Sequence, residues 1–70
     1  MAITIDAAEW LVLDNVKNGW PYRSNLSWDM ADKAYLRCVE NEYIKNGRIT
    51  PAGELALMTN PKPANPKECR

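Results

Sequence analysis

The segment GRITPAGELAL, residues 47–57, decides the fold, because it leads from a short strand directly into a helix. A strand over residues 48–50 would end at Thr50, whose hydroxyl can accept a hydrogen bond from a free amide at the start of a helix. Pro51 then occupies the first helical position, where its missing N–H costs nothing. We therefore predict a strand from Arg48 to Thr50 and a helix from Pro51 to about Met58.

The pair Asn46-Gly47, just before this junction, has two interpretations. Asn-Gly is the preferred centre of a two-residue hairpin, because both residues tolerate positive φ. It is also a good signal for the end of a helix. We favour the helix end, with the strand 48–50 pairing with the β-branched run Ile3-Thr4-Ile5, so that neither strand edge stands alone.

The first helix is predicted over residues 7–18. Asp6 sits where an N-cap belongs, and Glu9 completes a capping-box pair three residues later. Gly19 suits the left-handed position after a helix, and Pro21 prevents an easy restart. The large apolar residues follow a helical spacing: Trp10, Leu13, Val16 and Trp20.

A loop over residues 21–27 leads to a second predicted helix, which Ser27 caps and which runs to about Lys45. Its pattern advances by three and four, as one face of a helix does. A break near Asp32, giving two helices instead of one, stays open. The residues of the pattern are Ala31, Ala34, Tyr35, Cys38, Val39 and Glu42.

The last twelve residues, TNPKPANPKECR, hold three prolines and no large apolar side chain. Such a composition cannot bury enough apolar surface to fold. We predict a folded domain over residues 1–58 and a disordered, proline-rich C-terminal tail over residues 59–70. The fold class is mostly α with a minimal two-stranded β-sheet.

Composition limits the function. Nine lysines and arginines balance nine aspartates and glutamates, whereas dedicated nucleic-acid binders usually carry excess positive charge. The chain has no histidine, so a serine or cysteine nucleophile lacks its usual base, and the two cysteines cannot form a four-ligand zinc site. Cys38 reads as a small buried hydrophobe. We expect no enzymatic activity, cofactor or metal, no membrane span, and a reduced, cytoplasmic protein.

The stretch AYLRCVENEYIKNGRITPAGELAL, residues 34–57, resembles the second half of small winged helix-turn-helix domains. Gly47, Ile49, Thr50 and Gly53 occupy the family's G-x-[IL]-T-x-x-G turn before its closing helix. The resemblance implies a three-helix domain whose second half presents a DNA-recognition helix. Two features depart from it: the wing is almost absent, and the helix before it carries carboxylates beside its basic residues.

The candidate binding residues form two groups. The basic or polar group would place Lys33 and Arg37 in a DNA groove and use Lys45 and Arg48 on the phosphates. The alternative is a solvated helix surface with charge pairs such as Asp29–Lys33. The full group is Arg23, Lys33, Arg37, Asn41, Lys45 and Arg48.

The second group is aromatic and clusters around the 21–27 loop. Trp20, Tyr22 and Trp28 could form an exposed protein anchor or stack on single-stranded bases. For Trp20 and Trp28 we favour the other interpretation, in which they close the ends of the small core. Tyr22 could serve either role.

Three functions remain. The charge balance favours a small accessory or inhibitor module that docks on a larger protein. The family resemblance implies that this partner is a host or phage protein, since small neutral domains with a winged-helix appearance occur often in phage genomes. The family resemblance favours a DNA-binding regulator of transcription. The third is a purely structural subunit that oligomerises through Tyr35, Val39 and Tyr43, and a homodimer is one form it could take.

Overall fold

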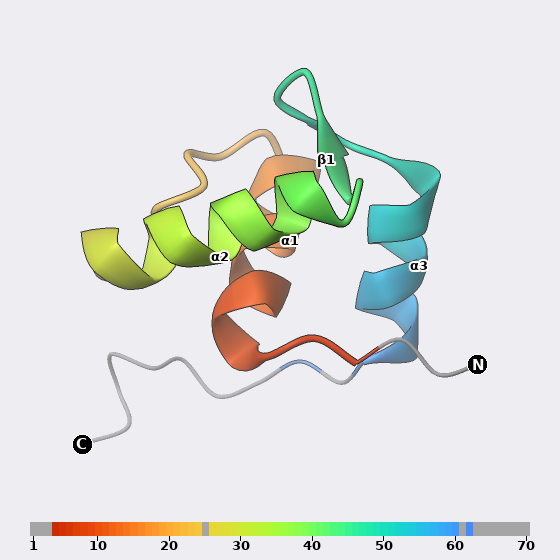
Figure 1. Ribbon diagram of the computed structural model, residues 1–70, viewed down its shortest axis with the longest axis horizontal. Helices are drawn as coiled ribbons and strands as arrows, with labels where there is room; N and C mark the ends of the chain where they lie inside the picture. The colour runs from red at the N-terminus through yellow and green to blue at the C-terminus, as the bar shows by residue number, and fades with distance from the viewer. Residues whose placement is uncertain (1–3, 25, 61, 63–70) are drawn as a thin grey trace.

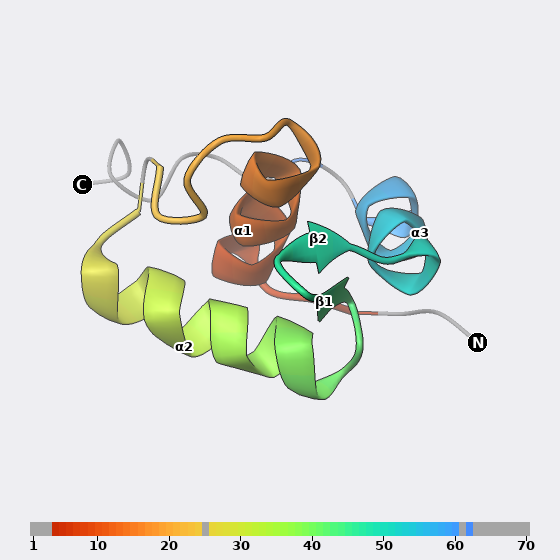
Figure 2. The same cartoon turned by 90° about the horizontal axis from the view of Figure 1, so that it is seen from above.

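The computed structural model describes residues 4–24, 26–60 and 62. Its elements are α1 (Ala7–Lys17), α2 (Trp28–Glu40), β1 (Ile44–Lys45), β2 (Arg48–Ile49) and α3 (Pro51–Thr59). Helix α2 crosses α1, and the β1–β2 hairpin lies between the C-terminal end of α2 and the start of α3 (Figures 1 and 2). The described part of the chain is thus mostly helical with one two-stranded sheet, as the sequence predicts.

Side chains at the helix starts explain why the helices begin where they do. Asp6 and Glu9 form the expected capping box of α1, with Glu9 N donating to Asp6 Oδ1 at 2.9 Å and Asp6 N donating to Glu9 Oε1 at 3.0 Å. Ser27 caps α2, and Thr50 caps α3 by accepting from Gly53 N at 3.1 Å. Each cap satisfies an amide that has no partner within its helix.

Helix α2 is continuous through position 32, but it ends at Glu40, earlier than the predicted end at about Lys45. The reason lies in its own periodicity. A longer helix would place Glu42 and Lys45 four and seven residues after the buried Cys38, on the same inward face. It would also turn Ile44, which is 2% exposed, away from the core. Ending the helix keeps both charges in solvent and lets Ile44 point inward.

The Asn46-Gly47 pair forms the turn of a hairpin, so the favoured interpretation as a helix end is wrong. Both residues have positive φ, 55° and 76°, as a type I′ turn requires. The strand from Arg48 therefore pairs with the residues before the turn, in the register Ile44–Ile49 and Lys45–Arg48. The predicted pairing with residues 3–5 does not form: Thr4 and Ile5 are not in a strand, and Ile3 lies outside the described residues.

The core is built where the helices meet. Leu13 and Val12 of α1 are fully buried, and the alanines of α2 allow close approach of the two helices. The other buried apolar residues are Ala8, Leu11, Leu26, Ala31, Ala34, Cys38, Ile44, Ala56 and Leu57.

Gly53 explains how closely α3 packs on the hairpin. A Cβ atom at this position would overlap the Tyr43 carbonyl oxygen and would lie 2.8 Å from Ile49 Cγ1. Only glycine therefore fits at this crossing, which accounts for the second glycine of the GRITPAG segment.

The predicted boundary at residue 58 stays a prediction, because residues 61 and 63–70 lie outside the described residues. Helix α3 includes Thr59, and Asn60, its C-cap residue, forms a hydrogen bond with α1. The carbonyl oxygen of Asn60 accepts a hydrogen bond from the Trp10 indole N–H at 3.0 Å.

Candidate functional site

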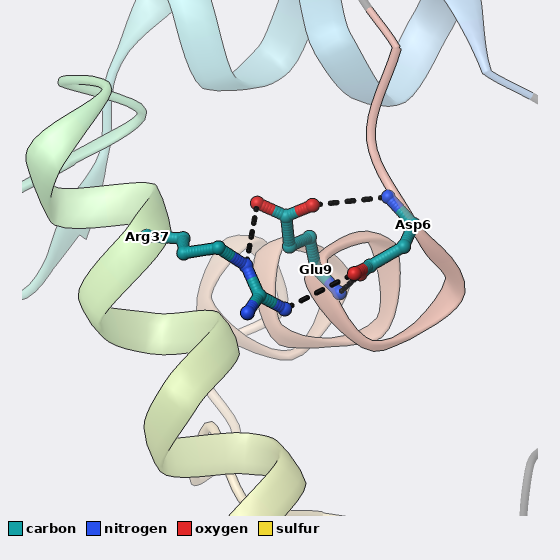
Figure 3. A network of polar contacts seen from close by, with 3 residues as sticks. All are labelled: Asp6, Glu9 and Arg37. Atoms are coloured by element: carbon teal, nitrogen blue, oxygen red, sulfur yellow. Dashed lines mark hydrogen bonds and ion pairs between the residues drawn. The ribbon is translucent and has the colours of Figure 1, made fainter.

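Arg37, a candidate DNA contact, is held in an ion-pair network that joins α2 to the start of α1 (Figure 3). Its Nη2 atom lies 3.0 Å from Asp6 Oδ2, and its Nε atom lies 3.5 Å from Glu9 Oε2. Glu9 is 8% exposed, so burial removes most of the hydration of its carboxylate. The ion pair with Arg37 compensates for that loss. Arg37 therefore neutralises two carboxylates of the same chain.

Arg23, a second basic candidate, is paired with Asp32. Its Nε atom donates to Asp32 Oδ1 at 3.1 Å, and the Tyr22 hydroxyl donates to the same oxygen at 2.7 Å. These contacts lower the pKa of Asp32, chiefly through the Tyr22 hydrogen bond. The same hydrogen bond raises the pKa of Tyr22, because ionisation would lose the donated proton.

The aromatic residues form a layered arrangement around Arg23. Its guanidinium carbon lies 5.2 Å from the Tyr22 ring centre and 4.6 Å from the Trp28 ring. Tyr22 in turn packs against Tyr35, with ring centres 4.4 Å apart. Asn15, which is buried in α1, holds the loop in place by donating to the carbonyl oxygens of Tyr22 and Ser24 at 3.1 and 2.9 Å.

Trp20 and Trp28 do not close the ends of the core, so the interpretation favoured from the sequence is wrong. They are 55% and 70% exposed. The core between the helices is filled instead by aliphatic side chains, alanines and Cys38, and the indole that packs against it is that of Trp10. Trp28 begins α2, and its ring lies over Arg23 at the surface.

The remaining candidates are spread over the surface of α2, its C-terminal end and the hairpin. Lys33 is exposed on α2, and no ion pair joins it to Asp29 in the part of the chain that the structure describes. Asn41 is the C-cap of α2, where its backbone N–H donates to Arg37 and Val39 carbonyl oxygens. Lys45 and Arg48 are opposite each other on the exposed hairpin, next to the turn.

The exposed surface of α2 is divided between two flanks by the 3.6-residue helical repeat. One flank carries Met30, Lys33, Arg37 and Glu40 and turns toward the start of α1, where Arg37 meets Asp6 and Glu9. The other, which we name the apolar flank, consists of Trp28, Asp32, Tyr35, Leu36 and Val39. On it, Leu36 is 62% and Val39 42% exposed.

Two hollows adjoin the apolar flank, one on each side of Tyr35. The hairpin hollow, about 580 Å³, lies between α2 and β1. The loop hollow, about 280 Å³, is lined by Tyr22, Arg23, Asp32, Tyr35 and Leu36. The lining of the hairpin hollow is Tyr35, Val39, Glu42, Ile44, Lys45, Asn46 and Gly47.

Tyr22, Trp28 and Lys45 were predicted from the sequence as binding candidates, and Tyr35 and Val39 as oligomer contacts, but Leu36 was not predicted as a surface residue. A signal was present, since Leu36 lies outside the pattern of buried positions on α2. A large aliphatic residue on the solvent face of an otherwise one-sided helix indicates a contact site.

The cysteine and carboxylate side chains of the described residues bear on thiol chemistry and metal binding. Cys38 is fully buried, and burial together with the negative charge of Glu9 raises the pKa of its thiol to about 12. Within the described residues, no three cysteine or carboxylate side chains are placed to hold a metal ion. No helix in this part of the chain has the length and apolarity needed to cross a bilayer.

Comparison with known proteins adds no identification: no family model, curated protein or solved structure matches this chain.

Proposed function

We propose that this chain is a non-enzymatic protein-interaction module on a reduced winged-helix scaffold, and that it docks on a larger protein through the apolar flank of α2. The supporting observation is that two exposed apolar side chains of this flank each line a hollow: Val39 lines the hairpin hollow and Leu36 lines the loop hollow. Apolar side chains grouped at the surface around a hollow are typical of protein-binding sites.

The shape of this surface suits a helical segment of a partner. Positions 28 and 39 lie eleven residues apart, which is about 16 Å along a helix. A partner helix of three turns matches that length and can place apolar side chains in the hollows on both sides of Tyr35. Aromatic residues at the end of the flank provide rigid contact area.

A role in DNA binding is the second candidate, supported by Lys45 and Arg48, which lie opposite each other on the exposed hairpin in the place of a wing. Against it, Arg23 and Arg37 are already paired with carboxylates. Phosphate contacts depend on cationic charge that is free to replace counterions. The geometry therefore supports protein docking better.

The test compares Leu36→Glu with Lys33→Glu, two exposed positions of α2 on different flanks. A photo-crosslinking amino acid at position 36 identifies the partner, which is then purified and titrated against each variant. We expect the partner to bind the wild type and Lys33→Glu but to lose at least tenfold in affinity for Leu36→Glu. Equal affinity for the two variants would contradict docking through the apolar flank.

DNA binding is tested separately with random duplex DNA at about 50 mM salt, where weak phosphate contacts are detectable. The informative variants are Lys45→Glu and Arg48→Glu, because Arg37 substitutions also disturb the contact between α1 and α2. Salt-sensitive binding that both variants abolish would favour the DNA-binding candidate instead.

A further inference from the structure

We infer that the apolar flank of α2 also binds a second copy of this chain, in a two-fold symmetric dimer in which the two α2 helices pack antiparallel. This inference rests on the proposed function, because it assigns an occupant to the same surface. It follows from three properties: the shape of the flank, the charges around the hairpin hollow and the backbone conformation of Glu42.

The flank is complementary to itself in shape. A two-fold symmetric interface uses the same patch on both subunits, so each patch must supply both a projecting and a receiving feature. Leu36 projects into solvent from the middle of α2, and the hairpin hollow opens beside Val39 on the same flank. An antiparallel arrangement whose two-fold axis passes near Val39 brings the two hairpin hollows together and directs the leucine of each copy toward the hollow of the other.

The charges around the hairpin hollow are also self-complementary. Glu42 and Lys45 both line it. Neither takes part in an ion pair among the described residues. A second copy offers the opposite charge to each: its Lys45 for Glu42 and its Glu42 for Lys45. With a formal net charge of zero, long-range repulsion does not oppose the approach of two copies.

Glu42 occupies a position where the fold itself favours glycine. Helices α1 and α2 end with the same two hydrogen bonds, which for α2 are Glu42 N to the Val39 carbonyl at 3.0 Å and Tyr43 N to the Cys38 carbonyl at 2.8 Å. In α1 the left-handed residue of this motif is Gly19, with φ of 77°, and in α2 it is Glu42, with φ of 62°. A side chain is strained in this conformation. The strained residue directs a carboxylate to the rim of the hollow, which suits a binding role.

The available area indicates a weak dimer. A standard interface covers about 800 Å² on each partner, about one sixth of the chain's accessible surface of 4874 Å². The proposed interface uses one flank of a 13-residue helix and the adjoining hairpin, and we expect it to stay below that size. We therefore expect dimerisation at tens to hundreds of micromolar, a range in which another protein with a better fit can displace the second copy.

The experiment uses charge reversal at two positions. The Glu42→Lys variant carries two cations at its hollow, and the Lys45→Glu variant carries two carboxylates. Each should self-associate at least tenfold more weakly than the wild type in sedimentation equilibrium. An equimolar mixture of the two variants should regain wild-type association, because both cross-pairs become attractive. The double variant should also regain it. Circular dichroism verifies that all variants stay folded, which we expect because both side chains are exposed.

A wild type that stays monomeric up to about 1 mM would overturn the inference. So would single variants that associate as well as the wild type, or a mixture that fails to regain association. The Leu36→Glu variant separates this result from the proposed function. If the wild type is monomeric but the crosslinked partner still requires Leu36, only the dimer is wrong. If neither interaction depends on Leu36, the proposed function fails as well.

Discussion

The Nε atom of Arg37 lies 3.5 Å from Oε2 of Glu9, and this contact joins the middle of the chain to the start of α1. Glu9 uses its other oxygen to accept the Asp6 N–H in the capping box. One carboxylate therefore both caps α1 and binds α2 (Figure 3). A residue that the family resemblance would assign to DNA recognition instead stabilises the packing of the two helices.

Replacing Arg37 should therefore affect folding. Arg37→Ala leaves the nearly buried carboxylate of Glu9 without its cation, and we expect the free energy of unfolding to fall by about 1–2 kcal/mol, since Arg37 and Asp6 are partly exposed. Urea denaturation measures this. Lys33→Ala, on the same flank, is the matched control and should change stability by less than about 0.5 kcal/mol.

A double-mutant cycle assigns the effect to the ion pair. In a Glu9→Gln background the capping hydrogen bond is kept but the carboxylate charge is absent, so Arg37→Ala should cost clearly less than in the wild type. An equal cost in both backgrounds would show that the Arg37 side chain acts through Asp6 or through packing, and not through Glu9.

Gly53→Ala should destabilise the domain by about 1–3 kcal/mol, the usual cost of forcing an extra carbon into a packed contact. The Tyr43 carbonyl belongs to the backbone and cannot move aside as a flexible side chain would. Ala52→Gly, at the exposed preceding position, is the control. Thermal unfolding measures both, and an unchanged melting temperature for Gly53→Ala would contradict the close packing of α3 on the hairpin.

Tyr22→Phe should raise the pKa of Asp32 toward its ordinary value of about 3.9, because the hydroxyl donor is the largest cause of its lowered pKa. A carboxyl group whose pKa is lower in the folded state stabilises the fold above its unfolded pKa. This contribution is lost as the pH falls through the folded pKa. Below about pH 4 the stability difference between wild type and Tyr22→Phe should therefore shrink.

A carboxyl-carbon NMR titration gives the Asp32 pKa directly, and unfolding curves at pH 3 and pH 6 give the stability difference. An Asp32 pKa that is the same in both proteins would show that Arg23, and not Tyr22, controls this carboxylate.

Truncation at two points tests where the domain ends. Removing residues 63–70 should leave the melting temperature nearly unchanged, as their composition predicts. Removing residues 59–70 also deletes Asn60, whose carbonyl oxygen accepts a hydrogen bond from the Trp10 indole. This longer truncation should lower the melting temperature by several degrees. A large effect of the shorter truncation would place residues 63–70 in the folded domain.

Local sequence determined the helix starts and one of the ends. Asp6 with Glu9, Ser27 and Thr50 each satisfy free amides within one turn, Pro51 has no N–H that would need a partner, and Gly19 adopts the left-handed conformation after α1. Such signals involve residues close together in the chain, so they can be recognised without knowing the fold. The burial of Cys38 was predictable for a similar reason, from helical periodicity.

Only the tertiary structure decided between the two meanings of Asn46-Gly47 and the roles of the aromatic and basic residues. The hairpin lets Ile44 enter a core built by all three helices, while Thr50 donates hydrogen bonds to the carbonyl oxygens of Glu42 and Tyr43 across the turn. Arg37 binds Asp6, 31 residues away. Trp28 and Leu36 remain exposed because aliphatic side chains from three helices already fill the core. Contacts between segments distant in sequence thus determined which residues form the candidate binding surface.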